Sequence, residues 1–259
     1  MLIKAKTLKG YKLDSKDGEF GKVKEFYFDD NHWTIRYLIA DTGNWLIGNQ
    51  VLISPYALVS VNKEEKNIGV NLTKKQIEDS PPLSSDKPVS QQFEEDYHSY
   101  YGWPNYWSGS DMWGDYPTII RDSKEWKASN QNKKKWDPNL RSSSFVTGQK
   151  IQATDGEIGN VDDFIIDDET WAIRYLVIDT ASWWAGKKVL VSPKWIDQIS
   201  WDELKVFVNL SRENIMQSPE YSQEDLLTRD YETQLHRYYN REVYWRLDPS
   251  ERQTRMEDK

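Results

Sequence analysis

The chain repeats itself. The segment WTIRYLIADT at residues 33–42 returns as WAIRYLVIDT at residues 171–180. Residues 8–107 align with residues 146–245 without a gap, and roughly 37 of these 100 positions are identical. A repeat of this length is far longer than a solenoid unit, so the alignment predicts two whole domains in tandem. Each half is long enough to bury a core of its own.

The repeat also sets the predicted domain boundaries. We expect a first domain over residues 1–107, a partly packed linker over residues 108–144, a second domain over residues 145–245 and a charged tail over residues 246–259. The linker is rich in Ser, Asn, Lys, Gly and Asp, which is the composition of a connecting segment. Because duplicated domains often bury equivalent faces, the two repeats are predicted to pack as an internal pseudo-dimer.

Short apolar runs alternate with turn residues in each repeat. Asp17 and Gly18 predict a hairpin, since glycine supplies the positive φ that a tight turn requires. In residues 33–40 the odd positions are apolar and the even positions are mixed, which predicts a strand with one core face and one partly covered face. About six short strands in roughly 65 residues favour a small closed barrel or sandwich over an open α/β sheet.

Helical signals follow the strands. Thr73 and Ser211 are predicted to cap short helices that end before a proline. A second helix is expected at about residues 91–101 and 229–239, where most of the paired tyrosines lie. The predicted fold class is therefore mainly β with short helices, an α+β arrangement of two small barrels or sandwiches that are each followed by one or two helices.

The composition excludes several classes of protein. The chain has no cysteine, so disulfides, thiolate metal sites and cysteine nucleophiles are ruled out, and a reducing compartment fits. Its net charge of -8 gives no reason to expect nucleic acid or anionic lipid as a partner. No apolar run reaches the roughly 18 residues of a membrane span. We therefore expect a soluble cytoplasmic protein.

Three elements occur in the same order in both repeats. They are DGEFGKVKEFYFDD, IRYLIADT and VLISP in the first, and DGEIGNVDDFIIDD, IRYLVIDT and VLVSP in the second. This combination resembles the PRC-barrel family, which is named for the cytoplasmic domain of the photosynthetic reaction centre H subunit. The segment EEDYHSYYG at residues 94–102 also resembles the segment that follows the barrel in that subunit. The resemblance implies two tandem PRC-type β-barrels that hold partners, with no catalytic residues.

Two arginines occupy equivalent positions in the clearest strands. Arg36 and Arg174 could bind a carboxylate or phosphate ligand, or they could form structural ion pairs, which we favour. The nearby acids are Asp29 and Asp41 for the first arginine, and Asp167 and Asp179 for the second.

Catalytic and metal-binding patterns are not found in the sequence. The acidic pairs Asp29–Asp30 and Asp167–Asp168 lack the spacing of a calcium loop and are interpreted as turn residues. His98 and His236 have no second ligand at helical spacing, which favours packed helix faces over a metal site. Serine nucleophile motifs and glycine-rich phosphate loops are also missing. We predict no enzyme activity, no metal and no cofactor.

The chain is unusually rich in tryptophan, with 13 residues. Exposed Trp and Tyr side chains often anchor interfaces, but the same residues could fill the space between the two repeats. We predict a non-enzymatic adaptor or scaffold that binds an unidentified protein partner. The alternative is a carbohydrate- or small-ligand-binding module, and an enzyme that acts through Asp and Glu ranks lower. The candidate binding residues are Trp45, Trp103, Trp107, Trp113, Trp183 and Trp184.

Overall fold

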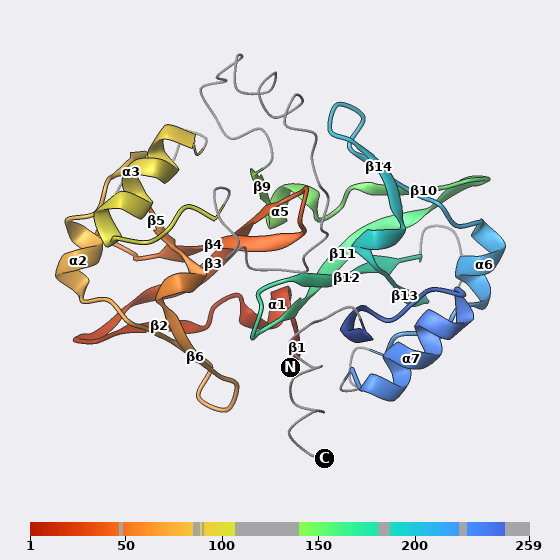
Figure 1. The fold of residues 1–259 in the computed structure, drawn as a ribbon, viewed down its shortest axis with the longest axis horizontal. Coiled ribbons are helices and arrows are strands. Elements are labelled where there is room, and N and C mark those ends of the chain that lie inside the picture. The colour runs from red at the N-terminus through yellow and green to blue at the C-terminus, as the bar shows by residue number, and fades with distance from the viewer. Residues whose placement is uncertain are drawn as a thin grey trace. The chain divides into compact units, whose positions relative to one another are not determined.

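The computed structural model describes residues 1–46, 49–84, 89, 91–106, 140–180, 187–222 and 227–246. The chain divides into two compact units, each with a sheet and short helices (Figure 1). The mainly β class predicted from the sequence is confirmed. Unit 1 comprises Met1, Ile3–Ser144 and Asp167–Ala172, and unit 2 comprises Leu2, Phe145–Ile166 and Ile173–Lys259.

The sheet of unit 1 has the strand order β6-β7-β2-β3-β4-β5-β8, with β9 paired to β3. All of these pairs are antiparallel except β2 with β7. The strands are β2 (Lys12–Ser15), β3 (Gly18–Asp29), β4 (Thr34–Asp41), β5 (Asn49–Ile53), β6 (Leu58–Asn62), β7 (Asn67–Val70), β8 (Leu83–Ser84) and β9 (Leu140–Ser142). The helices are α1 (Ala5–Leu8), η1 (Pro55–Ala57), α2 (Lys74–Glu78) and α3 (Gln91–Tyr101).

Unit 2 repeats this plan with the strand order β13-β12-β11-β10-β15-β14. The strand β1 (Leu2–Lys4), whose Leu2 belongs to this unit, pairs with β11. The other strands are β10 (Lys150–Ala153), β11 (Gly156–Asp167), β12 (Ile173–Asp179), β13 (Lys188–Val191), β14 (Ile196–Ser200) and β15 (Lys205–Val208). The helices are α5 (Ser143–Val146), which begins in unit 1 and ends in unit 2, and η2 (Pro193–Trp195), α6 (Arg212–Gln217), α7 (Arg229–Tyr238) and η3 (Tyr244–Arg246).

Local sequence signals explain the hairpins and helix starts. Residues Ser15 and Gly18 face each other across the β2–β3 hairpin, so the turn lies one position before the predicted Asp17–Gly18 pair, and Gly18 has a φ of 120°. Thr73 caps α2, because its side chain accepts a bond from Gln76 N and the Gln76 side chain accepts one from Thr73 N. The predicted capping residue is thereby confirmed, as is Ser211 at the start of α6.

The central strand β4 departs from the sequence expectation in two ways. It begins at Thr34 because Trp33 adopts a φ of 52° in the turn, where its N–H donates to Asp29 O at 2.7 Å. Both faces of β4 are also buried, since Arg36 and Leu38 are as enclosed as Ile35 and Tyr37. The mixed even positions Thr34, Arg36, Leu38 and Ala40 are therefore buried and do not meet solvent.

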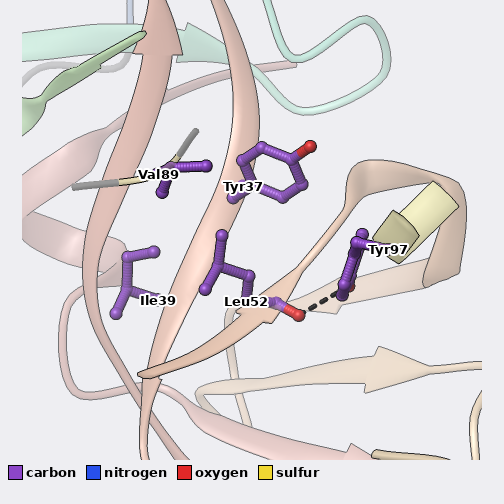
Figure 2. Close-up of a cluster of buried hydrophobic side chains, with 5 residues drawn as sticks. All are labelled: Tyr37, Ile39, Leu52, Val89 and Tyr97. Atoms are coloured by element: carbon purple, nitrogen blue, oxygen red, sulfur yellow. Dashed lines mark hydrogen bonds between the residues drawn. The ribbon is translucent and has the colours of Figure 1, made fainter. Parts of the chain in front are cut away.

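A buried cluster joins α3 to the sheet of unit 1. Figure 2 shows Tyr37 and Ile39 from β4, Leu52 from β5, and Val89 and Tyr97 from the segment that leads into and forms α3. The Tyr97 hydroxyl donates to Leu52 O at 2.6 Å. Because a buried phenol needs such a partner, this bond fixes α3 at one rotation and one height above β5.

Strand β9 lies inside the segment that the sequence predicts as linker. Its residues Leu140 to Ser142 pair with Asp29 to Tyr27 of β3, and Arg141 Nε contacts Asp30 Oδ2 at 2.9 Å. The Ser142 hydroxyl donates to the Glu25 carboxylate. The sequence did not predict this strand, because its surroundings are rich in serine and because it forms only through pairing with β3, which is distant in sequence. None of the helices among the described residues has the length and apolarity needed to cross a bilayer.

Candidate functional site

An uncharged cleft opens between η1, α2 and α3 in unit 1. Its volume is about 380 Å³. We call it the aromatic cleft, because half of its lining residues are aromatic and none carries a formal charge. The lining residues are Tyr56, Ala57, Asn71, Leu72, Gln76, Tyr100, Tyr101 and Trp103.

Two tyrosines at the end of α3 bind α2 and form one side of the cleft. The hydroxyls of Tyr100 and Tyr101 both donate to the backbone carbonyl of Gln76, at 3.1 and 3.3 Å. Burial raises the pKa of Tyr101 to about 12, and the pKa of Tyr100 is raised by the same cause. Both phenols therefore remain protonated donors at neutral pH.

The backbone turn at the end of α3 places Trp103 at the cleft. Gly102 adopts a φ of 70°, a conformation that glycine tolerates, and its N–H donates to Ser99 O at 3.2 Å. The next N–H, that of Trp103, donates to His98 O at 2.9 Å. This pair of bonds is a Schellman C-cap, which turns the chain sharply after the helix. The turn brings the indole back over the helix end.

The indole of Trp103 stacks on two tyrosines. Its centroid lies 4.4 Å from that of Tyr101 with an interplanar angle of 15°, and 5.9 Å from that of Tyr56 with an angle of 24°. Trp103 is half-buried and packs against the cluster of Figure 2. It therefore forms a wall of the aromatic cleft and also contributes to the packing of α3.

A buried polar network lies behind the cleft. The hydroxyls of Tyr37 and Tyr106 both donate to Glu94 Oε1, at 2.9 and 2.7 Å. The same Tyr37 hydroxyl lies 3.1 Å from His98 Nε2, and His98 Nδ1 lies 3.0 Å from Pro104 O. Glu94, His98 and Tyr37 are all fully enclosed. The network connects β4, α3 and the loop that carries Trp103.

Unit 2 contains the same network at equivalent positions. The hydroxyls of Tyr175 and Tyr244 donate to Glu232 Oε1, at 3.0 and 2.9 Å. The Tyr175 hydroxyl lies 2.9 Å from His236 Nε2, and His236 Nδ1 lies 2.8 Å from Glu242 O. Because both copies are enclosed and make the same bonds, we interpret the network as a structural link between strand and helix.

Burial sets the protonation of these groups. The pKa values of His98 and His236 are lowered by burial, which disfavours the imidazolium. Burial raises the pKa of Glu232, although bonds from Tyr244 and Tyr175 oppose this shift. The pKa values of Tyr37 and Tyr175 lie well above the usual value of a phenol for the same reason. The network therefore favours neutral histidines and protonated phenols.

The sequence carries a signal for this network. The four residues that contribute side chains to it are identical in the two repeats, and each is polar or aromatic rather than aliphatic. Polar residues that persist in both copies are candidates for a buried, mutually satisfied cluster. What the sequence could not provide is the pairing of Tyr37 with a helix more than fifty residues later.

The two predicted ion-pair arginines are buried against tyrosines. Arg36 NH2 lies 3.2 Å from Asp29 Oδ2, and its guanidinium carbon lies 4.2 Å from the ring centroid of Tyr106. The Arg174 guanidinium lies 4.1 Å from the ring centroid of Tyr244. These positions favour the structural interpretation of both arginines over ligand binding.

The acids named as candidate partners lie in different surroundings. Asp29 is buried, and its pKa is lowered to about 2 because bonds from His32 and the charge of Arg36 outweigh the opposing effect of burial. Asp41 is exposed and accepts a bond from Gly43 N at 3.0 Å. Asp179 Oδ2 lies 4.0 Å from Lys188 Nζ. Of the two acids proposed for Arg36, the structure thus places Asp29 beside it.

The tryptophan candidates divide into two groups. Trp45 is half-buried, with its ring in an edge contact with Phe20 at 6.3 Å. Trp103 lines the aromatic cleft. The other four candidates, Trp107, Trp113, Trp183 and Trp184, lie outside the described residues. Within the described part of the chain, no group of three or more His, Asp or Glu side chains could hold a metal ion.

Comparison with known families places the repeats in one group. Residues 2–77 and residues 140–214 each match the model of the PRC-barrel domain. The two matched segments together cover more than half of the chain. The first runs from β1 into α2, and the second runs from β9 into α6. No curated protein shows a significant match to the chain.

Proposed function

The chain belongs to the PRC-barrel domain family, and on this premise we propose that it is a non-enzymatic adaptor whose first PRC-barrel unit binds a protein partner at the aromatic cleft. The observation that carries the proposal is the cleft itself. It presents four aromatic residues together with polar groups on an uncharged concave surface, and Tyr and Trp are frequent anchors of protein interfaces.

Two features of the cleft support a role in binding. Tyr100 keeps 43% of its surface exposed and Trp103 is half-buried, so both rings have surface left to bury against a partner. Bonds from Tyr100 and Tyr101 to Gln76 O also hold the rings before any partner arrives. A site that is ordered in advance loses less conformational entropy on binding.

The proposal is tested by affinity capture from the source cell with two matched variants. We expect the wild-type protein to retain a stoichiometric partner, and Tyr100→Ala to reduce its yield at least about tenfold, the effect of losing one interface anchor. Tyr238→Ala is the control, because Tyr238 occupies the equivalent position in unit 2 with 38% of its surface exposed. Thermal unfolding would show that both variants are folded.

The outcomes separate the two parts of the proposal. If no protein is enriched by the wild-type bait, the adaptor function is wrong. If a partner is retained equally by Tyr100→Ala and by the wild type, the chain is an adaptor but its partner binds elsewhere.

A small-ligand-binding module is the second candidate function. The volume of the aromatic cleft lies within the range of small-molecule sites. The stacking of Trp103 on Tyr56 and Tyr101 disfavours a sugar that needs an open indole face. Titration with a panel of mono- and disaccharides, followed by nuclear magnetic resonance, would contradict this argument if any sugar shifted the Ala57 or Leu72 signals.

A further inference from the structure

The aromatic cleft exists in unit 1 at a position where unit 2 has a large side chain. Ala57 and Trp195 are the equivalent residues of η1 and η2. Their backbones make the same bonds: Ala57 N donates to Ser54 O and Trp195 N donates to Ser192 O, both at 2.9 Å. The two backbones are therefore alike, and the difference is a methyl group against an indole.

In unit 2 the indole of Trp195 is enclosed by the helix that follows. Only 4% of Trp195 is exposed, and its ring lies 4.7 Å from that of Tyr239 and 5.3 Å from that of His236. Unit 2 thus packs an aromatic ring of its own chain between η2 and α7.

In unit 1 a ring reaches the same helix from another direction. Tyr101 and His98 are the equivalents of Tyr239 and His236, and they contact Trp103 at 4.4 and 6.2 Å. Trp103 comes from the loop after α3, and its equivalent in unit 2 is the exposed Arg241. The indole that contacts this helix thus comes from η2 in unit 2 and from the loop after α3 in unit 1.

In unit 1, Trp103 thus supplies the aromatic contact that Trp195 makes in unit 2, and the residue at the position of Trp195 is Ala57, with 2% of its surface exposed. A cleft of about 380 Å³, lined by Ala57 and Trp103 among others, lies beside these rings. In unit 2 the same framework encloses a planar aromatic ring.

We propose that the aromatic cleft of unit 1 binds a neutral aromatic ring of about indole size, which the protein partner presents as a side chain. The inference rests on the proposed adaptor function and names the chemistry that it recognises. Neutral rings are favoured because no charged residue lines the cleft, so a charged group would lose its hydration without gaining a partner. Asn71 and Gln76 add polar groups to the lining of the cleft.

The first test uses N-acetyl-L-tryptophanamide as the probe and N-acetyl-L-leucinamide as the matched non-aromatic control. Both are titrated into the full chain with methyl-labelled alanine and leucine. We expect the aromatic probe to shift the Ala57 and Leu72 methyl signals saturably, with a dissociation constant of about 1 mM for a single side chain. The leucine probe should bind at least about tenfold more weakly. Equal binding of both probes, or none, would overturn the proposal.

The second test closes the cleft in the way that unit 2 does. The double variant Ala57→Trp with Trp103→Arg transfers the Trp195 and Arg241 pair into unit 1, and its packing has a precedent within the chain. We expect it to lose the aromatic probe at least about tenfold while its melting temperature stays near that of the wild type. Unchanged binding would contradict the assignment. If the double variant is unfolded, Ala57→Leu gives the same test with a smaller side chain.

The probe experiments need no partner, so their failure differs from failure of the adaptor function. If the protein captures a partner but does not bind the aromatic probe, the adaptor function is supported and the specificity for an aromatic ring is wrong. Probe binding without any captured partner leaves the ring site standing and assigns it to a free aromatic small molecule, which overturns the partner side chain as its source.

Discussion

Tyr37 places one phenol between a glutamate and a histidine in the core of unit 1. A backbone carbonyl can only accept, so His98 Nδ1 must carry the proton that it donates to Pro104 O. The other ring nitrogen of His98, Nε2, lies 3.1 Å from the Tyr37 hydroxyl. This hydroxyl has a single proton, which it donates to Glu94 Oε1. Burial lowers the pKa of His98 and so favours the neutral imidazole in this position.

Removing this hydroxyl should destabilise the unit that contains it. We expect Tyr37→Phe to lower the free energy of unfolding of unit 1 by about 1–3 kcal/mol, because a buried acceptor loses its donor. Tyr175→Phe should act alike in unit 2. Hydrogen exchange of the β4 and β12 amides measures each unit separately.

Tyr100→Phe is the control for this experiment. It also removes a tyrosine hydroxyl, but one whose bond to Gln76 O lies at the exposed surface, where water can replace it. Its effect should stay within about 0.5 kcal/mol. Equal losses of unfolding free energy in Tyr37→Phe and Tyr100→Phe would show that the buried network contributes no more to stability than a surface hydrogen bond.

The buried histidines predict a pH dependence of stability. Their folded pKa values lie below the usual 6.5, so the unfolded chain takes up these protons more readily. Their contribution is complete above about pH 6.5 and is lost as the pH falls through the folded pKa values. Melting temperatures should therefore fall between pH 7 and 5.

Glu232 acts in the opposite direction, so the histidine contribution must be isolated. Because its folded pKa is raised, Glu232 binds a proton more readily in the folded state and adds stability on acidification. The double variant His98→Gln with His236→Gln retains Glu232 and should melt with a smaller fall between pH 7 and 5 than the wild type. An identical fall in both proteins would contradict the role assigned to the histidines.

At the scale of elements, the features that the sequence predicted are those set by neighbouring residues. The hairpin at Gly18, the capping box at Thr73 and the alternating run of β4 each depend on a few adjacent positions. β9 was missed because its three residues have no pattern of their own and form a strand only beside β3. The strand β9 is therefore determined by its tertiary contacts rather than by its own sequence pattern.

The candidate site was predictable only in part. Trp103 was named from aromatic composition and lines the cleft, while its role in binding stays a prediction. Ala57 also lines the cleft, but it is a small residue that carries no chemical signal. Its meaning appears only when Trp195 is seen on the same backbone in unit 2.

The pairing of β9 can be tested in the full chain. Replacing Leu140, Arg141 and Ser142 with glycine raises the entropy cost of this strand and removes the contact between Arg141 and Asp30. We expect faster hydrogen exchange at Tyr27 to Asp29 of β3. Arg141→Ala, which keeps the strand backbone and loses only the ion pair, should have a smaller effect. Unchanged exchange in the triple variant would show that β9 adds nothing to the sheet.

At the scale of the whole molecule, the two repeats share the buried hydrogen-bond network between strand and helix and differ at the surface beside it. The network around Tyr37 and Tyr175 uses identical residues in both units. The residues around the cleft have changed, with Tyr56 replaced by Lys194 and Trp103 by Arg241 in unit 2. One framework thus supports two different surfaces, and only unit 1 is proposed to bind an aromatic ring.

The net charge gives a prediction for the whole chain. At -8, the protein should repel the phosphate backbone, so we expect no measurable binding to duplex DNA or RNA at 0.15 M salt. An electrophoretic mobility assay with random-sequence duplexes provides the measurement. Retardation that weakens as salt is added would reveal a basic patch and would remove nucleic acid from the excluded partners.

The place of β9 in the chain affects how unit 1 can be made on the ribosome. Its sheet needs residues 140–142, which follow the end of α3 by more than thirty positions. At a synthesis rate of about 5–20 residues per second, β3 waits roughly two to eight seconds after α3 has been made before β9 is available. During this interval one edge of β3 at Tyr27–Asp29 is open to incorrect pairing. We expect the nascent unit 1 to be exposed to chaperones until the second repeat has begun to emerge.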